Sequence, residues 1–122
     1  MNQKINLHAV IIDDDQISCE QLKDLILESN LPVEIMGIYN DAQAGINAIA
    51  ELDPEILFLD VEMPEMNGFE LLKRIAPRKP EVIFVTSYDK YAVKAIRFAA
   101  LDYILKPVEK SELYTAVTNA LV

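Results

Sequence analysis

The sequence predicts a single α/β domain built on a parallel sheet. Five short segments of apolar, β-rich residues alternate with five segments of helical pattern along 122 residues. Such alternation is typical of a parallel sheet with helices on both faces. The length fits one domain rather than two, and no repeat, linker or low-complexity segment interrupts the pattern. We therefore expect residues 1–122 to form one domain.

The first half of the chain supplies three of the strands and two of the helices. The apolar run at 7–12 is short and uninterrupted, which predicts a strand buried on both faces. The apolar residues of 16–29 fall on one helical stripe, and the β-rich residues 33–39 predict the next strand. Asp41 is a suitable N-cap for a helix over 42–52, which the pair Asp53-Pro54 ends. Another buried strand is predicted at 56–59.

The second half repeats the alternation after a loop at 61–68 that contains Pro and Asn-Gly. The segments predicted there are a helix over 69–76, a strand at 82–85, a helix over 90–99, a strand at 101–105 and a helix over 110–121. Right-handed crossovers leave few ways to connect such elements. For five strands the leading candidate is a flavodoxin-like sheet with strand order 2-1-3-4-5 and helices on both faces.

Charge and cysteine content exclude several classes of protein. The net charge is -9, with -13 in residues 1–72 and +4 in residues 73–122. A chain this acidic has little reason to bind nucleic acid directly. No apolar run approaches the ~20 residues that a bilayer requires, and the N-terminus lacks a secretory signal. The single Cys19 forms no internal disulfide and fits a reducing compartment, so we expect a cytoplasmic protein without a membrane partner.

Polar residues stand where the predicted strands end. Asp13 and Asp14 follow the first strand, Asp60 the third, Thr86 the fourth and Lys106 the fifth. Ligands of open α/β sheets bind outside the carboxyl ends of the strands, at the switch in strand order, which here lies between strands one and three. The three acids should therefore converge. Two carboxylates about 4 Å apart repel by roughly 4 kcal/mol at an effective dielectric constant near 20, so the cluster requires either a cation or a shifted pKa. For a cation, oxygen ligands favour Mg²⁺.

Four motifs in this order give the chain a family resemblance. Val10–Asp15, Phe58–Gly68, Phe84–Ser87 and Asp102–Pro107 together resemble the receiver domain of two-component response regulators. The stretch Ile83–Pro107 is most similar to receivers of LytTR-type regulators. A receiver is a phosphorylation-controlled signalling switch that catalyses only its own phosphorylation and slow dephosphorylation, so the resemblance implies that the chain is not a turnover enzyme.

The resemblance implies a role for each acid. Asp60 would accept a phosphoryl group from the phosphohistidine of a sensor histidine kinase, in a Mg²⁺-dependent reaction. Asp14 and Asp60 would bind Mg²⁺ directly, Asp13 would reach the ion through water, and Glu62 would supply its backbone carbonyl. No organic cofactor is implied. The Glu62 side chain also stands near the path of attacking water, as does Tyr88.

The resemblance also implies the residues of the switch. The Thr86 hydroxyl would move onto the phosphoryl group, and Lys106 would pair with that group. Tyr103 would swing inward when Thr86 moves, and the Lys106–Pro107 bond would be cis. Ordinary structural roles are the alternatives: Thr86 as a strand-end hydroxyl, Lys106 as a solvated loop lysine and Tyr103 as a packing residue.

Partners follow from the same resemblance. They are a sensor histidine kinase, a C-terminal DNA-binding effector domain outside this chain, and a second copy in a phosphorylation-dependent homodimer. Lys90, Lys94 and Arg97 recur on one side of the predicted 90–99 helix. They form either a solvated face or a docking face.

Other functions compete with this interpretation. Asp13-Asp14-Asp15 contains the Asp-x-Asp of haloacid-dehalogenase-like phosphatases, in which Asp13 would be the nucleophile, although no cap segment is inserted. A flavodoxin-like electron carrier requires a loop rich in Gly and hydroxyl residues where this chain has acids. A further alternative is an interaction module that is never phosphorylated. Separately, the role of Asp13-Asp14-Asp15 could be only to cap the next helix.

Overall fold

The computed structural model describes residues 6–122, in which strands and helices alternate as predicted. The elements are β1 (Leu7–Ile12), α1 (Gln16–Glu28), β2 (Val33–Tyr39), α2 (Ala42–Leu52), β3 (Ile56–Leu59), α3 (Gly68–Ile75), β4 (Glu81–Thr86), α4 (Ala92–Arg97), β5 (Asp102–Leu105) and α5 (Lys110–Ala120). Each lies within two residues of its expected bounds at either end.

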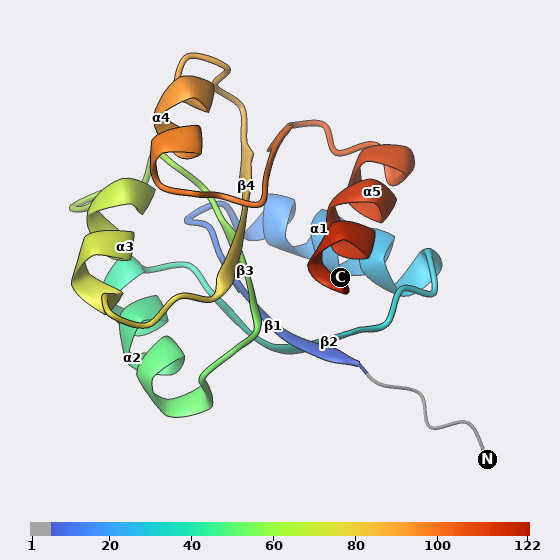
Figure 1. Cartoon of the computed structure of the whole chain (residues 1–122), viewed down its shortest axis with the longest axis horizontal. Coiled ribbons are helices and arrows are strands. Elements are labelled where there is room, and N and C mark those ends of the chain that lie inside the picture. The colour runs from blue at the N-terminus through green and yellow to red at the C-terminus, as the bar shows by residue number, and fades with distance from the viewer. Residues whose placement is uncertain (1–5) are drawn as a thin grey trace.

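The five strands form one parallel sheet in the order β2-β1-β3-β4-β5. Helices α1 and α5 cover one face of the sheet, and α2, α3 and α4 cover the other (Figure 1). This arrangement confirms the predicted flavodoxin-like topology, with the switch in strand order between β1 and β3. All five carboxyl ends lie at the same edge, because every pair of neighbouring strands is parallel.

The central strands are buried on both faces, as their uninterrupted apolar sequences predict. Alternate residues of β3 point to opposite sides: Phe58 packs in the layer under α1 and α5, and Leu57 and Leu59 pack in the layer under the other helices. All four β3 residues are at most 1% exposed. Burial of this extent fixes the register, since a slip by one residue would exchange the two layers.

Side-chain caps determine where three helices begin. Asp15, Asp41 and Asn67 each accept a hydrogen bond from a backbone N–H in the first turn of α1, α2 and α3, at 3.0, 2.7 and 2.9 Å respectively. The predicted cap at Asp41 is thus confirmed. Asp15 also serves as a cap, so its role differs from that of Asp13 and Asp14, the two acids before it.

Helix α4 is shorter than the predicted 90–99 segment. Tyr91 stands at its N-cap position without a side-chain capping bond, and Ala99 adopts a positive φ of 57° just after the helix. The sequence pattern could not show either boundary, because neither a capping residue nor a glycine marks them. The outer face of α4 leaves Val93 66% and Ile96 76% exposed.

Two further expectations concern the backbone and the membrane. The Lys106–Pro107 bond is cis, as the resemblance implied, and so is the Ala76–Pro77 bond. Within residues 6–122, every helix is too short or too polar to cross a bilayer.

Candidate functional site

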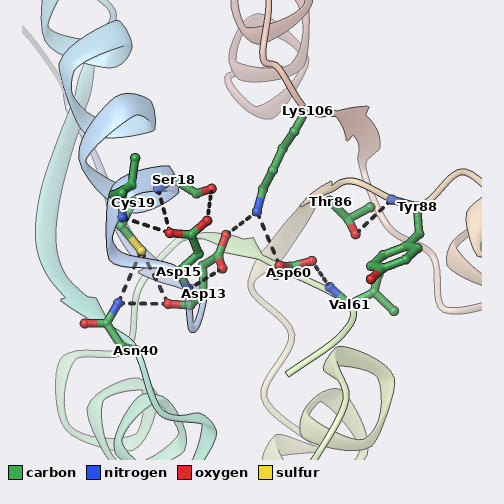
Figure 2. A network of polar contacts seen from close by, with 11 residues as sticks. Asp13, Asp15, Ser18, Cys19, Asn40, Asp60, Val61, Thr86, Tyr88 and Lys106 are labelled. Carbon is green, nitrogen blue, oxygen red and sulfur yellow. Dashed lines mark hydrogen bonds and ion pairs between the residues drawn. The ribbon is translucent and has the colours of Figure 1, made fainter. Parts of the chain in front are cut away.

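The functional side chains gather at the carboxyl edge of the sheet. Asp13 follows β1, Asp60 follows β3, Thr86 ends β4 and Lys106 follows β5. Figure 2 shows Lys106 reaching from one side toward the carboxylates of Asp13 and Asp60, with Thr86 beyond Asp60. Residues separated by up to 93 positions in sequence therefore share one pocket.

Three carboxylates form the centre of this pocket. One oxygen from each of Asp13, Asp14 and Asp60 lies within 4.8 Å of the other two. Asp13 is only 5% exposed and Asp60 only 7%, whereas Asp14 faces solvent. The structure thus confirms the convergence that the strand ends predicted, with one acid open to an incoming ligand.

Lys106 provides the positive charge nearest to the two buried acids. Its Nζ donates to Asp13 Oδ2 at 2.8 Å and to Asp60 Oδ2 at 3.4 Å. Burial by itself would lower the pKa of Lys106, but the hydrogen bond to Asp13 and the charge of Asp60 outweigh it and raise this pKa. The lysine therefore remains an ammonium at neutral pH. One cation facing three carboxylates leaves the pocket with net negative charge.

The net negative charge and the burial of the pocket affect the pKa of Asp13. Its burial, assisted by the negative charge of Asp60, raises the pKa of Asp13 from 3.8 to about 6. Hydrogen bonds from Lys106 and from the Asp15 backbone N–H oppose the increase without cancelling it. A further cation in the pocket would favour the charged form of Asp13.

The backbone around Asp60 is held closely. The Val61 N–H donates to Asp60 Oδ1 at 2.7 Å, and the Gly68 N–H donates to the Val61 carbonyl at 2.7 Å. A Cβ on Gly68 would lie 2.6 Å from the backbone oxygen of Asp60, so only glycine fits there without displacing the chain. The Asn67-Gly68 pair that suggested a turn therefore also sets the position of Asp60.

Thr86 and Tyr103 connect the pocket to the outer strand. Thr86 is fully buried, and its Oγ1 accepts a hydrogen bond from the Tyr88 N–H at 3.4 Å. The half-buried Tyr103 donates its hydroxyl to the Tyr88 carbonyl, and its ring lies 6.0 Å from that of Phe84. The residue Tyr88 is thus contacted both by the threonine and by the tyrosine that the resemblance assigned to a switch.

Comparison with known sequences places this geometry in a family. The profile described as the response regulator receiver domain matches residues 9–118. The chain belongs to the response regulator receiver family. Proteins of this family are typically not turnover enzymes. Membership in the family implies a switch controlled by phosphorylation. The acidic pocket of this receiver lies where the family motifs led us to expect it.

Curated relatives extend beyond the receiver. An "uncharacterized response regulatory protein" of Vibrio cholerae is 41% identical over 116 residues, which are 94% of this chain and 48% of the relative. The transcriptional regulatory protein BtsR of Escherichia coli is 36% identical over 108 residues, covering 88% of this chain and 45% of BtsR. The chain therefore spans about half the length of the curated relatives it matches.

Solved structures show the same fold. The response regulatory domain of protein mrkE from Klebsiella pneumoniae superposes with a TM-score of 0.85 at 26% identity, covering 94% of this chain and 95% of that one. The response regulator domain of Thermotoga maritima CheB gives a TM-score of 0.81 at 28% identity, covering 95% and 96% of the two chains.

The pocket of the receiver has the donor set that a hard divalent cation requires. Its donor atoms are carboxylate oxygens at the carboxyl edge of the sheet, and Asp14 leaves a side open to solvent. Mg²⁺ uses one or two carboxylates and retains water, which matches such a partly exposed set. The residues of this receiver therefore fit the cation that the resemblance implies.

Two neighbours of the acids were not predicted from the sequence. Asn40 donates from Nδ2 to the Asp13 carbonyl at 2.9 Å, and the Cys19 thiol donates to the same oxygen at 3.4 Å. Asn40 follows β2 at the same sheet edge, so its place at a strand end could have predicted that it lies near the acids. Cys19 is only 1% exposed, and this burial raises the pKa of its thiol to about 12.

A third unpredicted group lies on the opposite side of the pocket. Tyr91, at the start of α4, donates its hydroxyl to Glu62 Oε2 at 2.6 Å. Lys90 Nζ lies 4.0 Å from the same oxygen. The hydrogen bond from Tyr91 to Glu62, more than the burial of its ring, raises the pKa of Tyr91. No local pattern connects residues that are 29 positions apart.

Proposed function

We propose that this receiver is a Mg²⁺-dependent phosphoryl acceptor in which Asp60 is the phosphorylated residue. The observation that carries the proposal is the convergence of three carboxylates with Lys106 at the carboxyl edge of the sheet. Asp60 is one of the two buried acids that contact Lys106, and it is the one followed by the loop that Gly68 holds in place.

The proposed reaction transfers a phosphoryl group from a histidine kinase. A carboxylate oxygen of Asp60 attacks phosphorus, and the O–P bond forms as the N–P bond of the phosphohistidine breaks. The electron pair of that bond remains on the imidazole nitrogen, which takes up a proton. In the slow dephosphorylation that resets the switch, water attacks the phosphorus and releases a proton to solvent, while the bond between phosphorus and the Asp60 oxygen breaks. Inorganic phosphate leaves, and the Asp60 carboxylate is restored.

Two side chains of the receiver act on the transferred group. The Lys106 ammonium, already 3.4 Å from Asp60, pairs with the negative phosphoryl oxygens. The Thr86 oxygen is an acceptor in its contact with the Tyr88 N–H, so its hydroxyl proton is available for a phosphoryl oxygen. Movement of Thr86 alters the contact with Tyr88, which Tyr103 also holds, and we propose that these residues are the switch.

The acids of the pocket would hold Mg²⁺. We propose Asp14 and Asp60 as direct ligands, Asp13 as a ligand through water, and the Glu62 backbone carbonyl as a further ligand. The bound cation supplies charge neutralisation for the acids and for the phosphoryl group.

The partners of the proposed switch are a sensor histidine kinase and an output domain. Relatives about twice as long, among them a transcriptional regulatory protein, support an effector domain outside this chain. We propose that this domain binds DNA, that residues 1–122 are one receiver domain in the cytoplasm, and that phosphorylation promotes a homodimer.

Mapping of the modified residue tests the proposal. The chain is incubated with acetyl phosphate and Mg²⁺, the acyl phosphate is trapped with borohydride, and the peptides are sequenced. We expect label at Asp60, and none in the Asp60→Asn variant or in EDTA. Label at Asp13 would instead support the phosphatase alternative and would overturn our assignment.

A further inference from the structure

The loop that carries the phosphoacceptor is fixed at both ends but not at Glu62. Within residues 6–122, its backbone hydrogen bonds involve Val61, Pro64, Met66 and Gly68, and the Glu62 peptide takes part in none of them. The Glu62 side chain is 41% exposed and would be mobile if nothing held it. Its contact with Tyr91 is therefore what fixes this residue.

Tyr91 is suited to hold Glu62 because its own ring is packed. The ring centroid lies 6.2 Å from that of Phe69 and 6.2 Å from that of Tyr88. Lys90 Nζ lies 5.2 Å from the same ring and 4.0 Å from the Glu62 carboxylate. The hydroxyl is thus presented from a fixed direction, and its bond of 2.6 Å to a carboxylate is of the strong, charge-assisted kind.

We propose that Tyr91 is a positioning residue for the metal site: by holding the Glu62 side chain it fixes the Glu62 backbone carbonyl as a ligand for Mg²⁺. The inference rests on the proposed function, because it takes that carbonyl as a ligand. It adds the residue at the N-cap position of α4 to the set that determines cation affinity. Outer partners of metal ligands commonly have this role, since they orient the groups that bind the ion.

Tyr91 contributes more to this arrangement than Lys90 does. The ion pair of Lys90 with Glu62 is long, and the lysine side chain is 63% exposed, so solvent weakens the attraction. The hydrogen bond from Tyr91 is short and comes from a packed ring. Removal of the Tyr91 hydroxyl should therefore affect Mg²⁺ binding more than removal of the Lys90 charge.

The test compares Mg²⁺ affinity in the wild-type chain and in Tyr91→Phe. Phe keeps the ring and its packing but lacks the donor. Affinity is measured from the increase in melting temperature during a Mg²⁺ titration, and independently from the Mg²⁺ dependence of the rate of phosphorylation by acetyl phosphate. We expect the half-saturating Mg²⁺ concentration to rise about five-fold, a typical effect of one lost hydrogen bond. The rate at saturating Mg²⁺ should stay within about two-fold of wild type, because Tyr91 does not contact the reacting atoms.

A double-mutant cycle separates positioning from general effects on the fold. In the Glu62→Ala background the acceptor is absent, so adding Tyr91→Phe should leave the half-saturating Mg²⁺ concentration unchanged. The loss of the Glu62 charge is common to both variants of that pair and cancels. Tyr114→Phe, which removes a hydroxyl from an exposed tyrosine on α5, is the matched control and should behave as wild type.

The outcomes distinguish failure of the positioning role of Tyr91 from failure of the proposed Mg²⁺-dependent function. An unchanged Mg²⁺ requirement in Tyr91→Phe, or an equal effect of Tyr91→Phe with and without Glu62, would overturn the positioning role. If Tyr91→Phe folds poorly, Glu62→Ala alone decides the matter, because it removes the same hydrogen bond from a partly exposed side chain, and an unchanged Mg²⁺ requirement in that variant would overturn the positioning role. A wild-type chain that does not respond to Mg²⁺ would contradict the metal site itself, and with it both proposals.

Discussion

Replacement of Asp13 by Asn should stabilise the receiver when no divalent cation is present. Asp13 is buried beside Asp60, and this environment raises its pKa from 3.8 to about 6, so its charged form is unfavourable in the folded state. Asn has the shape of the protonated acid and can still accept the Asp15 N–H, which donates to Asp13 Oδ1 at 2.9 Å. The substitution removes one of three clustered charges and keeps this contact. It loses the hydrogen bond from Lys106 to Oδ2, a loss that the raised pKa already includes because that bond opposes the shift.

The expected gain follows from the change in pKa. A pKa raised from 3.8 to about 6 corresponds to about 3 kcal/mol at 1.36 kcal/mol per pH unit. Solvent reaches the pocket through the exposed Asp14 and screens the charges, which reduces the gain to about 1–2 kcal/mol. For a domain of this length that gain raises the melting temperature by roughly 5 °C.

The pH dependence has a defined sign. As the pH falls below about 6, folded Asp13 takes up a proton while unfolded Asp13 remains ionised down to about 3.8. The folded state then binds more protons, so the contribution of Asp13 to stability increases between about pH 6 and pH 4. The wild-type chain in EDTA should therefore gain stability relative to Asp13→Asn over this interval, and the two should differ most above pH 7.

Urea denaturation followed by circular dichroism measures these differences. Wild type and Asp13→Asn are compared in EDTA at pH 7.5 and at pH 5, and again with Mg²⁺ at pH 7.5. Mg²⁺ should stabilise wild type by mass action and should narrow or reverse the difference, because the ionised Asp13 helps to hold the cation. Asp24→Asn, at an exposed position of α1, controls for the change in net charge.

An Asp13→Asn variant no more stable than wild type in EDTA at pH 7.5 would contradict a destabilising charge on Asp13. An equal gain in Asp24→Asn would do the same, since the effect would then come from net charge alone. A wild-type melting curve that is identical in Mg²⁺ and in EDTA would show that the three acids do not share a cation.

Three further predictions follow from separate parts of the structure. Gly68→Ala should destabilise the fold by about 1–3 kcal/mol and reduce phosphorylation, because its Cβ would lie 2.6 Å from the Asp60 backbone oxygen; denaturation and acetyl phosphate labelling measure both effects. Cys19 should resist iodoacetamide at pH 8 in the native chain and react after denaturation, since burial raises its pKa to about 12; rapid native alkylation would contradict this. Arg97→Glu should weaken phosphorylation-dependent self-association in analytical ultracentrifugation if α4, with its exposed Val93 and Ile96, is a docking face, and an unchanged association would exclude that role.

The sequence determined the elements and the chemical character of their ends. Apolar runs such as 56–59 and the cap at Asp41 are local signals, which depend on neighbours within a few residues. The acids and Lys106 could be assigned to one edge because parallel strands share the direction of their carboxyl ends. Convergence of the site thus followed from pattern and topology before any distance was known.

Only the tertiary structure determined which side chains touch. The bond between Tyr91 and Glu62, the support of Asp13 by Asn40, and the shortened α4 have no signature in local periodicity. Each depends on how helices and loops pack around the sheet, and small shifts in packing decide whether a hydrogen bond forms. The pKa of Asp13 is likewise a property of the folded pocket, because burial and a charge 47 residues away in sequence produce it.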